Sequence, residues 1–216
     1  MIRVPAPLRL APLRLALLAC AALSLSGCIS LLPKSKPAHL YRFGEPVAAA
    51  APDMPARTVG VFRSNGAFQR ESAGDRLLTV DGGKVAYIAQ TRWAAPATVL
   101  WDEAVLAAFD ADPGPVRLIS RGEPASAAYV LRLDVRNFEA RYDHGPKAAP
   151  TVLVRVRAAM TRGTDKQLAE KIFEASVPAR DNRVGAIVPA YDKAVGEVLK
   201  AIVAWTNQQA APAAQS

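Results

Sequence analysis

Apolar and polar residues alternate along three segments in the second half of the chain, and this alternation predicts β-strands. Within residues 128–142, Leu131 and Leu133 fall on one side, whereas arginine and aspartate side chains fall on the other. Residues 151–161 and 170–177 repeat the pattern. Because successive side chains of a strand point to opposite faces, each strand has one buried and one wetter face. The connections between the segments predict an antiparallel meander.

Shorter apolar runs predict the remaining strands. Residues 77–80 and 84–88 flank the sequence Asp81-Gly82-Gly83, and an Asp-Gly pair between two such runs is typical of a β-hairpin turn. We expect further short strands at residues 40–43, 58–62 and 116–120. Residues 47–57 are rich in alanine and proline and predict a loop.

Two segments have the periodicity of amphipathic helices. Pro96 suits a first helical turn, and the helix that follows it ends near the helix-breaking residues 112–115. In the last helix, apolar residues recur at intervals of three and four and face away from lysine and glutamate. These apolar positions are Tyr191, Val195, Val198, Ile202 and Trp205. The elements together predict a mixed α+β fold, in which a mixed, largely antiparallel sheet packs against two main helices.

The start of the chain has the features of a bacterial lipoprotein signal. Three arginines precede a run from Leu15 to Leu25 that is dominated by leucine and alanine. This run is shorter than the ~20 residues that a transmembrane helix needs, as is usual for a signal peptide. It ends in Leu25-Ser26-Gly27-Cys28, where small residues precede a nucleophilic thiol. We therefore predict that residues 1–27 are removed and that Cys28 is acylated. The alternative is an ordinary signal peptide with a chance cysteine.

This leader sets the organisation of the rest of the chain. Residues 28–38 contain prolines and lysines and predict a lipidated tether. Residues 39–207 have the length of a single domain. Residues 208–216 are mostly glutamine, alanine and proline, so we expect a disordered tail.

The cysteines, Ser30 and the net charge limit where in the cell the protein is expected and which partners it can bind. Signal cleavage removes Cys20 and acylation consumes Cys28, so no thiol is left for a disulfide. Ser30 stands where an aspartate would favour retention in the inner membrane, so we expect the outer membrane, with the domain facing the periplasm. The net charge of +8 is scattered along the chain and falls when the leader leaves. With no basic stripe and no access to the cytoplasm, nucleic acid is excluded as a partner.

Catalytic and metal-binding patterns are missing from the sequence. The two histidines, His39 and His144, stand apart, and no nucleophile elbow, phosphate-binding glycine loop or zinc motif occurs. Asp143 beside His144 could form a base with its orienting carboxylate, although a solvated hairpin tip is the simpler interpretation. We expect no catalytic residue, no cofactor and no metal.

Arginines on the predicted meander form the most interesting polar set. Adjacent strands could bring them together on one sheet face, where Asp134 and Glu139 would balance them and water would cover them. The alternative is a surface that contacts phosphate headgroups or an acidic partner. The arginines are Arg132, Arg136, Arg155 and Arg157. We interpret the three tryptophans, Trp93, Trp101 and Trp205, as core residues, with an interface role as the alternative.

Three stretches of the chain carry a resemblance to a known family. The first is Leu40-Tyr41-Arg42-Phe43, which follows the acylated cysteine closely. The second is Val85-Ala86-Tyr87-Ile88 leading into Arg92-Trp93-Ala94-Ala95-Pro96. The third is the segment from Tyr129 to Glu139, together with a closing helix that ends in Trp205. On these residues the chain resembles the ABC-type transport auxiliary lipoproteins, also called PqiC-like proteins, over essentially all of its mature length.

The resemblance implies a function without catalysis. Such a protein is a lipid-anchored accessory of an ABC transport system that carries an MCE-domain protein, and it serves lipid traffic between membranes and envelope integrity. The implied partners are outer-membrane lipid through Cys28, an MCE-domain protein, an ABC permease and its ATPase, and, since some members form rings, further copies of the chain. The implied fold is similar to the amino-terminal domain of TolB. A periplasmic lipid carrier is the alternative, and an envelope hydrolase is a third hypothesis.

Overall fold

The computed structural model describes residues 37–44, 58–123, 125–162 and 168–210. Several predicted features lie outside these residues: the signal peptide, Cys28, the tether up to residue 36, the loop at 47–57, the turn at 163–165 and the tail beyond residue 210. Among the described residues, no helix combines the length and hydropathy that a bilayer crossing requires.

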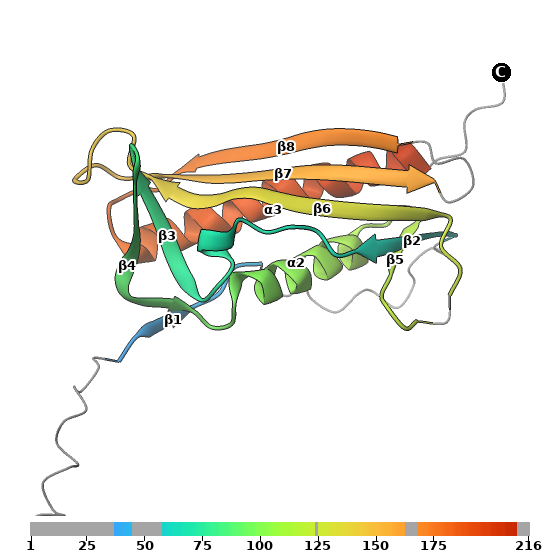
Figure 1. Cartoon of the computed structure of the whole chain (residues 1–216), viewed down its shortest axis with the longest axis horizontal. Coiled ribbons are helices and arrows are strands. Elements are labelled where there is room, and N and C mark those ends of the chain that lie inside the picture. The colour runs from blue at the N-terminus through green and yellow to red at the C-terminus, as the bar shows by residue number, and fades with distance from the viewer. Residues whose placement is uncertain (1–36, 45–57, 124, 163–167, 211–216) are drawn as a thin grey trace, which may run out of the picture. The chain divides into compact units, whose positions relative to one another are not determined.

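A mixed sheet forms the framework of the described domain (Figure 1). In chain order its strands are β1 (His39–Tyr41), β2 (Val59–Ser64), β3 (Arg76–Asp81), β4 (Lys84–Trp93), β5 (Val116–Ile119), β6 (Tyr129–Arg141), β7 (Thr151–Arg162) and β8 (Leu168–Pro178). The helices are η1 (Arg70–Ser72), α2 (Ala97–Ala111) and α3 (Val184–Ala210). The predicted fold class is therefore confirmed.

The long strand β6 organises the sheet. On one side it pairs with β7 along its length, and β7 pairs with β8, which confirms the predicted antiparallel meander. On its other side β6 meets β2, then a single bridge from Phe68 to Val135, and then β3. The hairpin of β3 and β4 is antiparallel as predicted. The parallel pairs, such as β1 with β4 and β2 with β5, are short.

The apolar face of the sheet and the two helices share one core. Helix α3 packs on β7 and β8, and α2 packs on β5 and α3 (Figure 1). Side chains that alternation assigned to the inner face, including Leu131, Leu133 and Val154, are buried. The five apolar positions predicted for the last helix and all three tryptophans are buried as well. This confirms the interpretation of the tryptophans as core residues.

The structure differs from the sequence prediction inside strand β6 and at the end of the last helix. A register shift between Val135 and Asn137 marks a β-bulge in β6. Because a bulge adds one residue to one strand, it changes which side chains face inward, and Phe138 and Ala140 enter the core. The last helix continues to Ala210, so the prediction of a disordered tail is wrong for residues 208–210, which are helical. Buried Ala210 explains the extension, because its contact with the core offsets the low apolar content of the last turn.

Candidate functional site

The candidate pair of Asp143 and His144 lies in an exposed turn. The Asp143 carboxylate accepts a hydrogen bond from the Arg141 guanidinium at 3.0 Å, and the exposed His144 beside it lies in a turn. His39 lies in the exposed strand β1. Within the described ranges, no group of three or more potential ligands could hold a metal ion. Cys28 lies outside those ranges, so its acylation stays a prediction.

The segment from Arg92 to Pro96 joins the sheet to α2. Trp93 ends β4 and packs edge-on against Phe43, with ring centroids 5.0 Å apart. Its backbone N–H donates to the carbonyl of Asp75, and the Arg92 guanidinium pairs with the Asp75 carboxylate at 2.6 Å. This geometry makes the segment a structural junction.

The first turn of α2 is capped by backbone rather than by a side chain. The N-cap residue Pro96 makes no side-chain cap bond. Instead, the N–H groups of Ala97 and Thr98 donate to the carbonyls of Gly74 and Ala73. The free N–H groups at a helix start need such partners. The loop before β3 therefore fixes where α2 begins against the sheet.

The predicted arginine set does gather on the face of the sheet opposite the helices, around a buried carboxylate. Asp134 of β6 is 3% exposed. Its Oδ1 accepts hydrogen bonds from Arg132 Nε at 2.9 Å and from the Ala67 N–H at 2.8 Å. Its Oδ2 lies 3.3 Å from Arg157 Nη1 and 3.8 Å from Arg136 Nη2. One carboxylate thus gathers three of the four arginines.

Opposing effects act on the pKa of Asp134, and the attractive ones prevail. Burial by itself raises the pKa of this carboxyl group, because it disfavours the charged form. The hydrogen bonds from Ala67 and Arg132, and the charges of Arg132 and Arg136, lower it by more, so the net pKa lies below its ordinary value. The carboxylate is therefore charged at neutral pH and neutralises the arginines around it.

The remaining members of the set are paired across neighbouring strands. Arg155 of β7 pairs with Glu174 of β8, and Arg157 also pairs with Glu170 of β8. Because these cations already have carboxylate partners, the face has little capacity left for a phosphate headgroup. The geometry favours the simpler of the two sequence interpretations.

Asp134 balances the arginines as predicted, but the prediction that the two acidic residues of this face are solvated is wrong. Asp134 and Glu139 are buried rather than solvated, and Glu139 does not pair with an arginine of the set. Instead, Glu139 accepts a hydrogen bond from Gln69 Nε2 at 2.8 Å. Gln69 Oε1 in turn accepts the N–H of Phe138 at 2.7 Å, just after the bulge. The Gln69 side chain, from the loop beside β6, therefore hydrogen-bonds both the Phe138 N–H next to the bulge and the buried Glu139 carboxylate.

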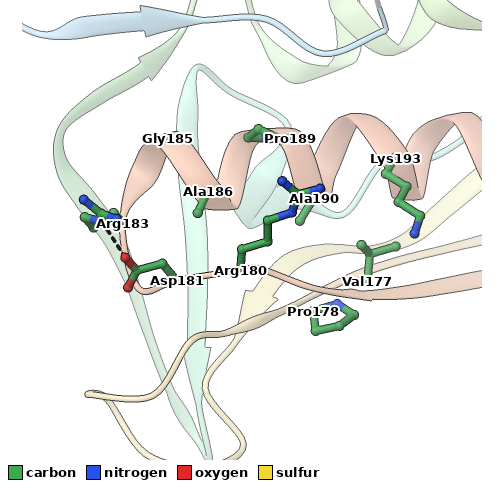
Figure 2. A pocket seen from close by; sticks show the side chains of 10 residues that line it. All are labelled: Val177, Pro178, Arg180, Asp181, Arg183, Gly185, Ala186, Pro189, Ala190 and Lys193. Carbon is green, nitrogen blue, oxygen red and sulfur yellow. Dashed lines mark hydrogen bonds and ion pairs between the residues drawn. The ribbon is translucent and has the colours of Figure 1, made fainter.

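A basic hollow lies where β8 ends and α3 begins, and the sequence analysis did not find it. A cavity of about 800 Å³ lies between the end of the strand and the first turns of the helix. Figure 2 shows the side chains that line it. Arg180, Arg183 and Lys193 line it, and Asp181 is its acidic residue. Arg183 Nε pairs with Asp181 Oδ2 at 2.6 Å. Three cations against one carboxylate give the hollow an excess of positive charge, which suits attraction of an anionic group.

A second hollow is apolar and lies between the two helices. Its volume is about 420 Å³, and small or aliphatic side chains such as Ala104, Ala108, Val195 and Leu199 line it. Asp192 at its rim accepts a hydrogen bond from the Gly44 N–H at 2.8 Å. The lining residues are four positions apart on each helix, which is the spacing of a buried helix face. The same spacing would place them in the core, so the sequence could not reveal a groove.

The comparison with known families decides what kind of protein this is. The family described as "ABC-type transport auxiliary lipoprotein component" matches residues 76–203, which include the Trp93 junction, the meander and most of α3. The chain belongs to this family. Such an auxiliary lipoprotein is a component of a transporter and is anchored to a membrane on its periplasmic side. The family resemblance stated from the sequence is thereby confirmed.

Solved structures have the fold of this auxiliary lipoprotein. Protein XCC0632 from Xanthomonas campestris, of family DUF330, is 22% identical with a TM-score of 0.67, and the match covers 80% of this chain and 97% of that protein. An uncharacterised protein is 13% identical with a TM-score of 0.59, and the match covers 79% of this chain and 99% of that protein. At such identities the likeness concerns the fold alone. No curated protein matches the sequence.

Proposed function

We propose that this auxiliary lipoprotein is a non-enzymatic subunit that links an MCE-type ABC transport system to the outer membrane. The family match over residues 76–203 carries this proposal. The sequence around Cys28 supports it, because an acylated N-terminal cysteine would place the domain at a membrane surface. In this function the acyl chains determine location, and the folded domain makes contacts with the transporter during lipid traffic between the membranes.

The described structure is consistent with a binding role. Its polar groups are engaged in structural contacts: Asp134 gathers arginines, and Asp143 pairs with Arg141. Neither forms the base and nucleophile pair that covalent hydrolysis requires. A binding subunit needs no such pair, because its function depends on surfaces.

Affinity purification from cross-linked cell envelopes tests the proposal. The wild-type protein and a Cys28→Ala variant would be isolated side by side, and the proteins recovered with each would be quantified by mass spectrometry. We expect an MCE-domain protein and an ABC permease with the wild type, and at least tenfold less of both with Cys28→Ala. Recovery of no transport component with the wild type would contradict the proposal.

The apolar groove between α2 and α3 favours a second candidate, a periplasmic lipid carrier. A volume of about 420 Å³ lies within the range of small-ligand sites. The soluble Cys28→Ala protein would then retain phospholipid in stoichiometric amount after purification, as measured by mass spectrometry of a solvent extract. A lipid-free protein would exclude this candidate and leave the docking function in place.

A further inference from the structure

The outer edge of β4 is open along most of its length in the described part of the chain. One edge of β4 pairs with β3. The other pairs with β1, but only at Thr91, Arg92 and Trp93. Figure 1 shows β4 at the margin of the sheet, beyond β3. Among the described residues, the stretch from Val85 to Ala89 therefore has no strand partner on this side, and such an edge is a template for another strand.

The hairpin turn determines which backbone groups face outward. Asp81 and Lys84 are paired across a two-residue turn, and the first turn residue, Gly82, has a φ of 56° that suits a type II′ turn. In such a hairpin the closing pair exchange hydrogen bonds with each other. By alternation, Val85 and Tyr87, which lie opposite Val80 and Leu78, turn their N–H and C=O groups away from β3.

This edge lacks the charges and prolines that usually protect against strand pairing. No charged residue occurs between Lys84 and Arg92. The side chain of Val85 is 61% exposed and that of Tyr87 is 37% exposed. Native proteins usually protect an open edge with charges, prolines or bulges, because an apolar edge pairs with other chains. An unprotected apolar edge therefore indicates a place where pairing is used.

Within the described residues, two features accompany the end of the β1 pairing at Thr91. Gln90 has a φ of 54°, which is unusual for a residue other than glycine, and the β3–β4 register shifts across this region. The Tyr41 carbonyl accepts the Ala94 N–H at 2.7 Å, so odd-numbered residues of β1 bond toward β4. Pro37 is the next odd position before His39, and a proline has no N–H to donate.

We propose that the edge from Val85 to Ala89 receives an extended strand of a partner protein by β-strand addition. Main-chain hydrogen bonds would supply the affinity of such a complex, and alternate side chains its selectivity. The added strand continues, on the same edge, the pairing that β1 already makes as far as Thr91. The residues of β4 determine what the added strand should contain. It should carry apolar residues at alternate positions and a carboxylate near Lys84. The identification of the partner as a component of the transport system rests on the proposed function.

The limited size of the edge argues for a partner that is also held elsewhere. A strand pair of this length buries far less than the ~1,600 Å² typical of stable complexes. Two free copies joined only through this edge would therefore separate. A transporter component held at the same envelope site meets the edge at a high effective concentration, and so needs less area. The occupant is therefore a strand of the transporter rather than a second copy.

A proline substitution at an outward position tests the proposal. In Val85→Pro the missing N–H faces away from β3, so the hairpin ladder is retained. Val85→Thr is the matched control, because it keeps the N–H and the β-branched shape. Both variants would be made in the acylated full-length protein and isolated from cross-linked envelopes. We expect Val85→Pro to recover at least tenfold less transport component than wild type, and Val85→Thr to recover within about twofold of it.

The outcomes separate this proposal from the proposed function. Equal recovery with Val85→Pro and wild type overturns the strand addition and leaves the docking function standing. Loss of every transport component from the wild type overturns both. A wild-type dimer in light scattering that Val85→Pro abolishes overturns the partner in favour of a second copy. If Val85→Pro lowers the melting temperature, Val85→Lys decides, because it keeps the backbone and adds a charge against an apolar strand at an exposed position.

Discussion

The open edges of β4 and β8 belong to one sheet but differ in their protection. Strand β8 pairs only with β7 among the described strands, so its far edge is open too. It carries Glu170, Lys171 and Glu174, and it ends at Pro178. Strand β4 has no charge between Lys84 and Arg92.

The charges of β8 are also anchored. Glu174 pairs with Arg155, and Glu170 pairs with Arg157, which in turn contacts the buried Asp134. An approaching strand would have to disturb this network, whereas between Val85 and Ala89 it would meet no charged side chain of β4. Charged side chains therefore protect the β8 edge against pairing with another strand, whereas the β4 edge lacks this protection.

The largest expected effect comes from removing the tryptophan that supports β4. Trp93 is buried against Phe43 and Tyr191 at the base of this strand. Truncation of a buried aromatic side chain costs about 3–5 kcal/mol, so Trp93→Ala should lower the free energy of unfolding by that amount. Chemical denaturation measures this loss.

Trp205→Ala is the matched variant on the other margin, because Trp205 packs on Phe173 of β8 with centroids 5.8 Å apart. We expect amide exchange to accelerate in β4 for Trp93→Ala and in β8 for Trp205→Ala. If both variants accelerated exchange in the same strand, the claim that Trp93 supports β4 and Trp205 supports β8 independently would be contradicted.

A smaller loss is expected when the carboxylate beneath the arginines is neutralised. Asp134→Asn keeps the shape of the side chain but removes a charge that three arginines surround. Loss of a charged, buried hydrogen-bonding group costs about 1–3 kcal/mol, measured by denaturant unfolding. Lys193→Ala, at an exposed position, should change stability by less than about 0.5 kcal/mol and serves as the control.

The same residue predicts a pH dependence. The pKa of Asp134 is lower in the folded protein than its ordinary value, so the unfolded chain binds this proton more readily. Its contribution to stability is complete above the ordinary pKa, about 4, and is lost as the pH falls through the lower folded value. Melting temperatures at falling pH should therefore converge for the wild type and Asp134→Asn. Parallel curves over that range would contradict the account.

The elements that were predictable are those with local causes. Alternation at Leu131 and Leu133 gives a strand, and the Asp-Gly turn gives a hairpin, because each pattern is decided by near neighbours. The burial of Glu139 could not be predicted, because its partner Gln69 is distant in sequence. The hollow lined by Arg180 and Lys193 likewise depends on how a strand end meets a helix start. Of the sequence-predicted site residues, Cys28 rests on a local motif and stays a prediction.

A smaller effect, of opposite sign, is expected at the bend of β4. Gln90 has a positive φ, which glycine adopts without steric cost. Gln90→Gly should raise the free energy of unfolding by up to about 1 kcal/mol, after the higher chain entropy of glycine is subtracted. Destabilisation by more than that amount would mean that the Gln90 side chain has a role of its own. Thermal unfolding with Gln90→Asn as the comparison distinguishes the two cases.

The smallest effect on folding is expected at the protected margin. Lys171→Val together with Glu170→Val removes two charges from the exposed part of β8. We expect the free energy of unfolding to change by less than about 0.5 kcal/mol for each exposed site. Self-association should rise, however, because the edge then resembles that of β4. Analytical ultracentrifugation over a concentration series checks this, and a variant that stays monomeric would show that charge does not protect β8.

Amide hydrogen exchange at the two margins tests the central claim most directly. The protein would be measured alone and again in the purified transport complex. We predict that Val85 and Tyr87 exchange rapidly in the isolated protein and at least tenfold more slowly in the complex, whereas β8 amides are unchanged. Unchanged exchange at these two residues, in a complex that contains the transporter, would contradict the claim that β4 is the docking edge.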